Sequence, residues 1–194
     1  MQAARGTPLN HSGGSAREPQ HRSGRLYLGL FATIALLAFA IDVVSKLIAV
    51  NTLSGRAPVQ VVGEYLQLDV VYNPGAAFSL GTSYTEVLTG IAICAAVVVL
   101  WVARRLRSTG WAIGLGFLLG GVLGNLSDRV FRSPGPLRGH VIDFLMFPHF
   151  PVFNVADICI NIAAATIIVQ ALRGVRVDGT RHEEAGAPTE ATGS

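Results

Sequence analysis

Two aspartates, Asp143 and Asp157, are notable because each lies among apolar residues. Asp143 lies within Val-Ile-Asp-Phe-Leu, and Asp157 opens an apolar run that reaches Leu172. Moving a carboxylate out of water is costly, so two carboxylates in apolar surroundings require an explanation. A carboxylate pair that shares one proton can activate a water molecule against a peptide bond, and this chemistry is the first hypothesis for the pair.

Asn154 lies three residues before Asp157, at the predicted start of a helix. An N-cap asparagine followed by an acidic residue in the first turn is ordinary helix capping, and this role is compatible with catalysis. The helix N-terminus favours the ionised form of Asp157, whereas burial favours the neutral form of Asp143. Aspartic proteases use one ionised and one protonated carboxylate. Separation along the chain does not by itself bring the two together, so other elements must position them.

The composition indicates a membrane protein. Of the 194 residues, 51% are hydrophobic and 14% are charged, whereas a soluble domain carries about 25% charged residues. This length predicts one domain. The net charge of +3 is small, so we expect no nucleic-acid partner. All but one of the 15 basic residues are arginines, which fits a GC-rich genome.

Four apolar runs are long enough to cross a bilayer, at about residues 26–50, 87–102, 111–129 and 155–172. The expected fold class is therefore an all-α membrane protein with four transmembrane helices. In the third run, Gly116, Gly120 and Gly124 recur at intervals of four residues, a spacing that allows close helix contact.

Residues 51–84 form the first loop. Within it, residues 65–72 are β-branched, aromatic and partly alternating, which predicts a strand, and residues 59–62 are its candidate partner. Asn73-Pro74-Gly75 ends the strand as a turn, and the apolar patch Ala76–Phe78 returns to the membrane surface. We expect a small extracytoplasmic β-sheet in this first outer loop.

The two ends of the chain are polar. Residues 1–25 and 173–194 are predicted to be disordered tails on either side of one four-span domain, residues 26–172. A cleavable signal peptide is the competing hypothesis for the N-terminus, but no small-residue cleavage site precedes Asp42. Arginines before the first run, in the loop 103–110 and after the fourth run place both termini in the cytoplasm. The second outer loop, between the third and fourth runs, also carries arginines, so the two sides of the membrane differ less clearly in arginine content.

Asp42 and Lys46 interrupt the far end of the first run, four residues apart and on one helix face. Two interpretations stay open, an interfacial ion pair with Lys46 extended towards the headgroups, or support of a polar site. At about 1.5 Å per residue, Asp42, Asp128 and Asp157 reach one level near the outer face. Asp143 lies in the loop that joins the last two spans.

Several blocks in order along the chain resemble the lipoprotein signal peptidase family, also called signal peptidase II, over about residues 26–172. They are Asp42 with Ser45 and Lys46, residues 72–78 (YNPGAAF), residues 120–129 (GGVLGNLSDR), residues 141–144 (VIDF) and residues 153–157 (FNVAD). No single block would be specific, but their combination is.

The resemblance implies a bacterial aspartic endopeptidase of the cytoplasmic membrane, with its active site near the outer face. Its substrate would be a prolipoprotein whose cysteine already carries a diacylglyceryl group, cut just before that cysteine. Globomycin-type peptides inhibit the family. We expect a monomer that lies among membrane lipids and uses neither cofactor nor metal.

The resemblance also assigns residues. Asp143 and Asp157 match the catalytic dyad of the family. The residues expected to bind substrate or to order the site are Asp42, Lys46, Asn73, Gly75, Phe78, Asn125, Asp128, Arg129 and Asn154. The sheet of the first loop matches a cradle at the membrane surface.

Two other classes of protein could use the same residues. A metalloprotease could use His140, Asp143, His149 and Asp157, but the chain has no His-Glu-x-x-His helix. A proton-coupled transporter could also use buried carboxylates, but the four runs show no inverted repeat and their carboxylates lie at one face.

Overall fold

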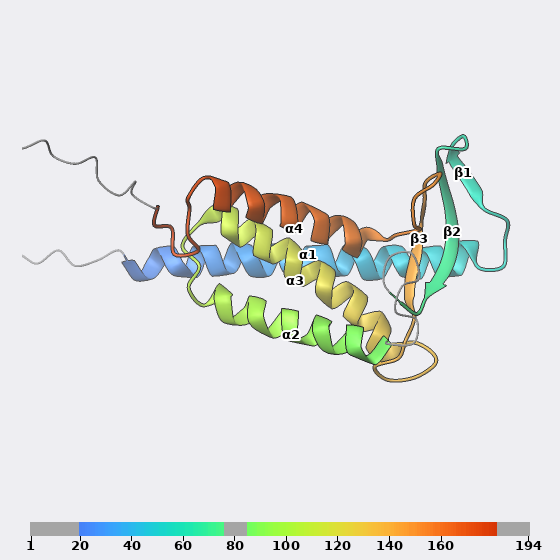
Figure 1. Cartoon of the computed structure of the whole chain (residues 1–194), viewed down its shortest axis with the longest axis horizontal. Helices are drawn as coiled ribbons and strands as arrows, with labels where there is room; N and C mark the ends of the chain where they lie inside the picture. The colour runs from blue at the N-terminus through green and yellow to red at the C-terminus, as the bar shows by residue number, and fades with distance from the viewer. Residues whose placement is uncertain (1–19, 76–84, 182–194) are drawn as a thin grey trace, which may run out of the picture.

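The computed structural model describes residues 20–75 and 85–181. Four long helices run along one direction, and a small sheet covers one end of them (Figure 1). The elements in chain order are α1 (Gln20–Leu53), β1 (Val59–Val62), β2 (Leu66–Asn73), α2 (Thr85–Ala103), α3 (Thr109–Phe131), β3 (Val141–Met146) and α4 (Val155–Leu172). Both ends of the described chain lie opposite the sheet.

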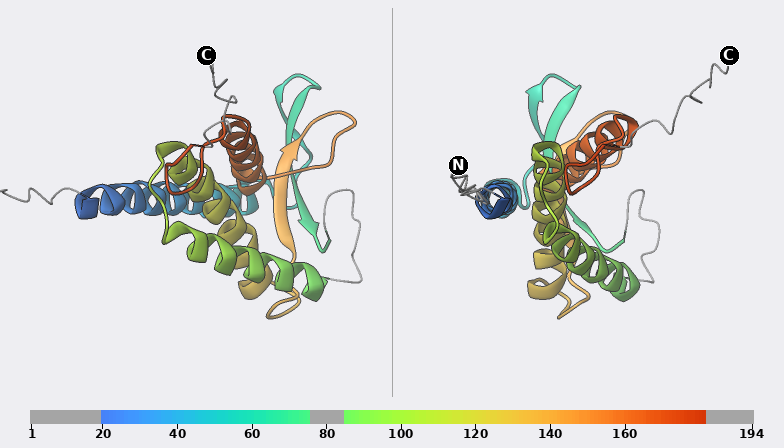
Figure 2. Two further views of the ribbon diagram at one scale, coloured as in Figure 1. Left: turned by 60° about the vertical axis from the view of Figure 1, so that its left-hand side comes forward. Right: turned by 90° about the vertical axis from the view of Figure 1, so that its left-hand side faces the viewer.

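All four helices are long and apolar enough to cross a membrane, which confirms the expected fold class. Helix α3 is central, because α1, α2 and α4 each pack against it (Figure 2). Many leucine, isoleucine and valine side chains on the outer faces of α1, α2 and α4 are exposed. In a bilayer these faces contact acyl chains. Among the described helices, the extensive packing is that of α3 against its three neighbours.

Glycines let α3 approach its neighbours, as their spacing predicts. A Cβ atom at Gly120 would lie 2.7 Å from the carbonyl oxygen of Ala35 on α1, and one at Gly121 would lie 2.6 Å from the carbonyl oxygen of Ala156 on α4. Both distances are shorter than real Cβ contacts, so only glycine allows this backbone approach. The two glycines thereby set how near α1 and α4 come to each other at the sheet end.

The sheet is antiparallel, with strand order β1-β2-β3. Strands β1 and β2 confirm the two strands predicted in the first loop. The sheet has a third strand that was not predicted: β3 comes from the connection between α3 and α4 and pairs with β2, placing Asp143 opposite Val71. Since β3 is buried on both faces, its sequence lacks the apolar and polar alternation that marks a half-exposed strand.

The predicted tails begin too close to the spans. Residues 20–25 are helical, because no proline interrupts residues 20–53 and the apolar helix continues into polar sequence. After α4, the chain to residue 181 turns back on the helices. Trp111 Nε1 donates to the carbonyl oxygen of Val175 at 2.8 Å, and the Arg107 amide donates to Val177 at 2.9 Å, which fixes this segment. The predicted residue Phe78 lies outside the described residues.

We predict that Gly120→Ala destabilises the protein by roughly 1–3 kcal/mol, because the added methyl group meets backbone on α1. The matched control is Gly90→Ala on α2, where a Cβ meets nothing within 4 Å. Thermal unfolding in one detergent measures both. Equal melting temperatures for the two variants would show that α3 does not need the close approach.

Candidate active site

The predicted polar residues gather where the helices meet the sheet. Asp42 and Lys46 come from α1, and Asp143 comes from β3. The other described members are Asn73 and Gly75 at the end of β2, Asn125, Asp128 and Arg129 on α3, and Asn154 and Asp157 at the start of α4. One cluster therefore collects residues from both loops and from three of the helices.

Asp143 lies on β3 and is 3% exposed. Its Oδ2 atom accepts a hydrogen bond from Asn73 Nδ2 at 2.9 Å, and its Oδ1 atom accepts one from Asn154 Nδ2 at 2.6 Å. Burial raises the pKa of Asp143 to about 6, and the charge of Asp157 adds to this rise, whereas the two amide donors oppose it. Burial therefore favours the neutral acid, as the sequence predicts.

Asn154 joins the two aspartates. It is the N-cap of α4, as predicted: its Oδ1 atom accepts from the Asp157 amide, and its own amide donates to Asp157 Oδ2, each at 3.1 Å. The side-chain amide of Asn154 donates to Asp143 as well. Asn125 Nδ2 donates to Asp157 Oδ1 at 2.9 Å. One fully buried asparagine thus contacts both carboxylates and fixes their relative position.

Lys46 is completely buried. Its Nζ atom forms ion pairs with Asp42 Oδ2 and Asp128 Oδ2, each at 2.8 Å, and donates to Asn125 Oδ1 at 2.9 Å. The interpretation in which Lys46 extends towards the headgroups is wrong, because Asp128 and Asn125 on α3 offer buried acceptors. The alternative, support of a polar site, fits these contacts.

The two acids bound to Lys46 also hold the backbone beside each dyad residue. Asp42 Oδ1 accepts from the amide of Ala156, the residue before Asp157, at 2.8 Å. Asp128 Oδ2 accepts from the amide of Ile142, the residue before Asp143, at 3.2 Å. A single buried cation therefore fixes the two acids that position the start of α4 and the middle of β3.

Asp128 also pairs with Arg132, four residues along α3, and not with the adjacent Arg129, because residues at that spacing share a helix face and consecutive residues do not. This spacing is visible in the sequence, yet Arg132 was not among the predicted site residues.

Arg129 is 7% exposed and binds backbone rather than a carboxylate. Its Nη2 atom donates to the carbonyl oxygen of Gly75 at 2.8 Å, and the Gly75 amide donates to Asn73 Oδ1 at 2.9 Å. Arg129 therefore holds the turn that follows β2, and with it the Asn73 side chain that contacts Asp143.

Over residues 20–75 and 85–181, no group of three or more His, Cys, Asp or Glu side chains is placed to hold a metal ion. The histidines of the metalloprotease alternative, His140 and His149, do not join Asp143 and Asp157 in such a group. The arrangement is a carboxylate pair with amide donors, and such a pair suits the transfer of a proton to and from water.

We predict that Lys46→Met destabilises the protein by roughly 3–5 kcal/mol, because it leaves Asp42 and Asp128 buried without their shared cation. The matched control is Arg138→Gln, which breaks the exposed pair with Glu86 and should cost about 1 kcal/mol or less. Denaturant unfolding compares the two variants. Similar losses would mean that the Lys46 network contributes no more than a surface ion pair.

Comparison with known proteins places this chain in a family. The family described as signal peptidase (SPase) II matches residues 34–173. The lipoprotein signal peptidase of Mycobacterium tuberculosis is 43% identical over 173 residues, 88% of this chain and 86% of that protein. The one of Streptomyces coelicolor is 40% identical over 166 residues, 86% of this chain and 81% of that protein.

Two solved bacterial membrane enzymes, both determined by the in meso method, share the fold. One superposes with a TM-score of 0.69 at 24% identity and covers 82% of this chain and 94% of its own. The other has a TM-score of 0.65 at 26% identity and covers 75% of this chain and 94% of its own. With the matched sequence and the shared architecture together, the chain belongs to the signal peptidase II family.

Proposed function

We propose that this membrane aspartic protease removes the signal peptide from prolipoproteins by cutting just before a cysteine that carries a diacylglyceryl group. Membership of the signal peptidase II family supports the removal of signal peptides from prolipoproteins. The observation that carries the site assignment is the pair formed by buried Asp143 and half-buried Asp157, joined through Asn154 at the end of the membrane helices.

In the proposed mechanism, Asp157 is the base and Asp143 is the acid. Asp157 lies in the first turn of α4, where the helix dipole stabilises negative charge, so it accepts a proton from the attacking water. The water oxygen bonds to the peptide carbonyl carbon while neutral Asp143 donates its proton to the carbonyl oxygen. Asp157 then passes its proton to the leaving nitrogen, the carbon–nitrogen bond breaks, and Asp143 recovers a proton as the carboxyl group of the signal peptide forms.

The position of the site supports a lipidated substrate. Asp143 lies on β3 and Asp157 in the first turn of α4, and this end of α4 lies beside the sheet (Figure 1), so a cysteine whose acyl chains stay in the bilayer would place its peptide bond at this level. By the arginine distribution, this is the outer face of the bacterial cytoplasmic membrane and both termini are cytoplasmic. Since both carboxylates come from one chain, we propose that a monomer is active.

We predict that the purified protein cleaves a diacylglyceryl-modified precursor, that globomycin blocks this cleavage, and that the unlipidated precursor is cut far more slowly. Asp143→Asn and Asp157→Asn should each reduce the rate by about 10²–10⁴-fold, because an amide can neither accept nor donate the required proton. The double variant should be no slower than either single variant, as expected for residues that act as a unit.

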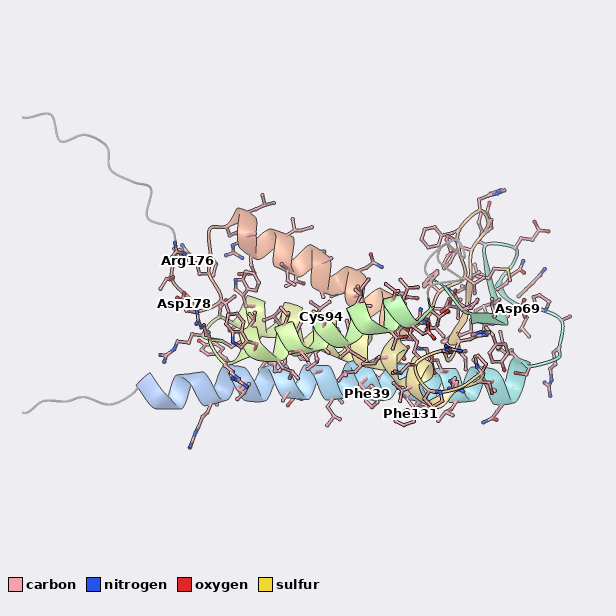
Figure 3. The ribbon with its side chains drawn as sticks, turned by 60° about the horizontal axis from the view of Figure 1, so that its bottom comes forward. Phe39, Asp69, Cys94, Phe131, Arg176 and Asp178 are labelled. Atoms are coloured by element: carbon pink, nitrogen blue, oxygen red, sulfur yellow. The ribbon has the colours of Figure 1, made fainter. Side chains whose placement is uncertain are left out.

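The matched control is Asp178→Asn at the opposite end of the bundle, where Figure 3 labels this aspartate. This control should keep the wild-type rate at a similar melting temperature. Retention of even about a tenth of the rate by either dyad variant would remove that residue from the proton transfer. Equal rates with and without the lipid would contradict the proposed substrate.

We predict that kcat/KM falls as the pH rises through about 6, because the pKa of Asp143 is raised to about 6 and its neutral form is lost above that value. Asn73→Ala should move this fall to higher pH, since Asn73 donates to Asp143 and stabilises its ionised form. The control is Gln60→Ala on β1, whose profile should match the wild type. An unmoved or lower midpoint for Asn73→Ala would refute Asp143 as the proton donor.

A further inference from the structure

The end of the bundle opposite the sheet carries a pocket of about 190 Å³ between α1 and the turn that follows α2. Its rim holds Arg25 from α1 and Arg104 and Arg107 from the turn, and its lining includes Leu28, Ala103 and Leu106. Ala103 and Leu106 are buried, so the pocket combines an apolar wall with three guanidinium groups. The dyad lies at the other end of the helices, so the pocket is separate from the catalytic site.

The three rim arginines have no acidic partner among the described residues. The basic residues that do form ion pairs within the described residues are Lys46, Arg132 and Arg138. Neighbouring charged residues make other contacts. The Cζ atom of Arg105 lies 5.3 Å from the centre of the Trp101 ring, and Asp178 accepts from the Thr180 amide and hydroxyl. Three like charges that converge on one pocket favour a bound anion.

The backbone under these arginines is fixed. The Arg107 amide donates to the carbonyl oxygen of Val177, and the Leu106 amide donates to that of Ala103. Because guanidinium groups bind phosphate oxygens in a forked, two-bond geometry, arginines held on a fixed turn suit a phosphate group.

The surroundings of the pocket are apolar and face the membrane. Leu28 on α1 is 47% exposed, and Trp101 on α2 is 56% exposed. Helices α1 and α2 both pack against α3 and make little contact with each other, so lipid-facing surface of both helices leads up to the pocket. A ligand that matches both features has an anionic head and an apolar tail, whereas a free phosphate ion matches only the arginines.

We propose that this pocket binds the phosphate headgroup of an anionic glycerophospholipid, whose acyl chains lie along α1 and α2. Basic pockets between membrane helices bind such headgroups in other proteins. The bound lipid would bridge the start of α1 and the turn between α2 and α3, and so stabilise the end of the bundle that lacks the sheet. This inference is independent of the proposed cleavage reaction.

The test is lipid retention by the full-length protein, purified from bilayers of phosphatidylcholine with phosphatidylglycerol and measured by native mass spectrometry. Arg104→Gln with Arg107→Gln should weaken phosphatidylglycerol retention roughly tenfold or more and abolish the rise in melting temperature that this lipid gives. The control removes the same charge from exposed arginines at the same end that do not line the pocket, by Arg173→Gln with Arg181→Gln. It should retain the lipid as the wild type does.

Three outcomes would overturn the proposal. Equal loss of lipid in the two double variants would mean that only general surface charge attracts it. An equal rise in melting temperature with inorganic phosphate would mean that the pocket binds a phosphate ion and not a lipid. Equal retention of phosphatidylcholine and phosphatidylglycerol by the wild type would mean that the arginines select no anionic headgroup.

Discussion

The buried ammonium of Lys46 is the constraint on which the rest of the site depends. Burying a charge is unfavourable unless it is paired, and Lys46 forms ion pairs with Asp42 and Asp128 and donates to Asn125. Those partners lie on α1 and α3, so the two helices must meet in one register at this level. The second oxygen of Asp42 and the shared oxygen of Asp128 accept from the amides of Ala156 and Ile142, so the position of Lys46 also bears on the positions of both proposed catalytic carboxylates.

The same network bears on the protonation of the dyad. Lys46 and Arg132 pair with Asp42 and Asp128, so these two acids have cations of their own beside them. Burial then decides the state of Asp143, whose pKa is raised to about 6, while the amides of Asn73 and Asn154 limit that rise. A carboxyl with a pKa near the working pH can both give up and recover its proton, which suits a residue that acts in each half of the reaction.

The sequence predicts the elements better than the contacts between them. Four apolar runs and the cap at Asn154 are local patterns, so the spans and the start of α4 could be predicted. Strand β3 could not, because a strand buried on both faces resembles any short apolar run. The burial of Lys46 could not be predicted either, since its spacing from Asp42 suits an exposed or a buried ion pair. What decides between them is Asp128 on α3, far along the chain.

The bilayer explains why the site lies at the end of the bundle. Membrane helices gain little by burying apolar surface against each other, so their association depends on close packing, and α3 supplies it with glycines that fit against the backbones of α1 and α4. Polar groups at the membrane centre would lack water, yet hydrolysis consumes water. At the sheet end the same helices bring the carboxylates together, with Asp157 half-buried and Asp143 and Asn154 buried. The site therefore combines a buried polar network, which positions the carboxylates, with a reaction that consumes water.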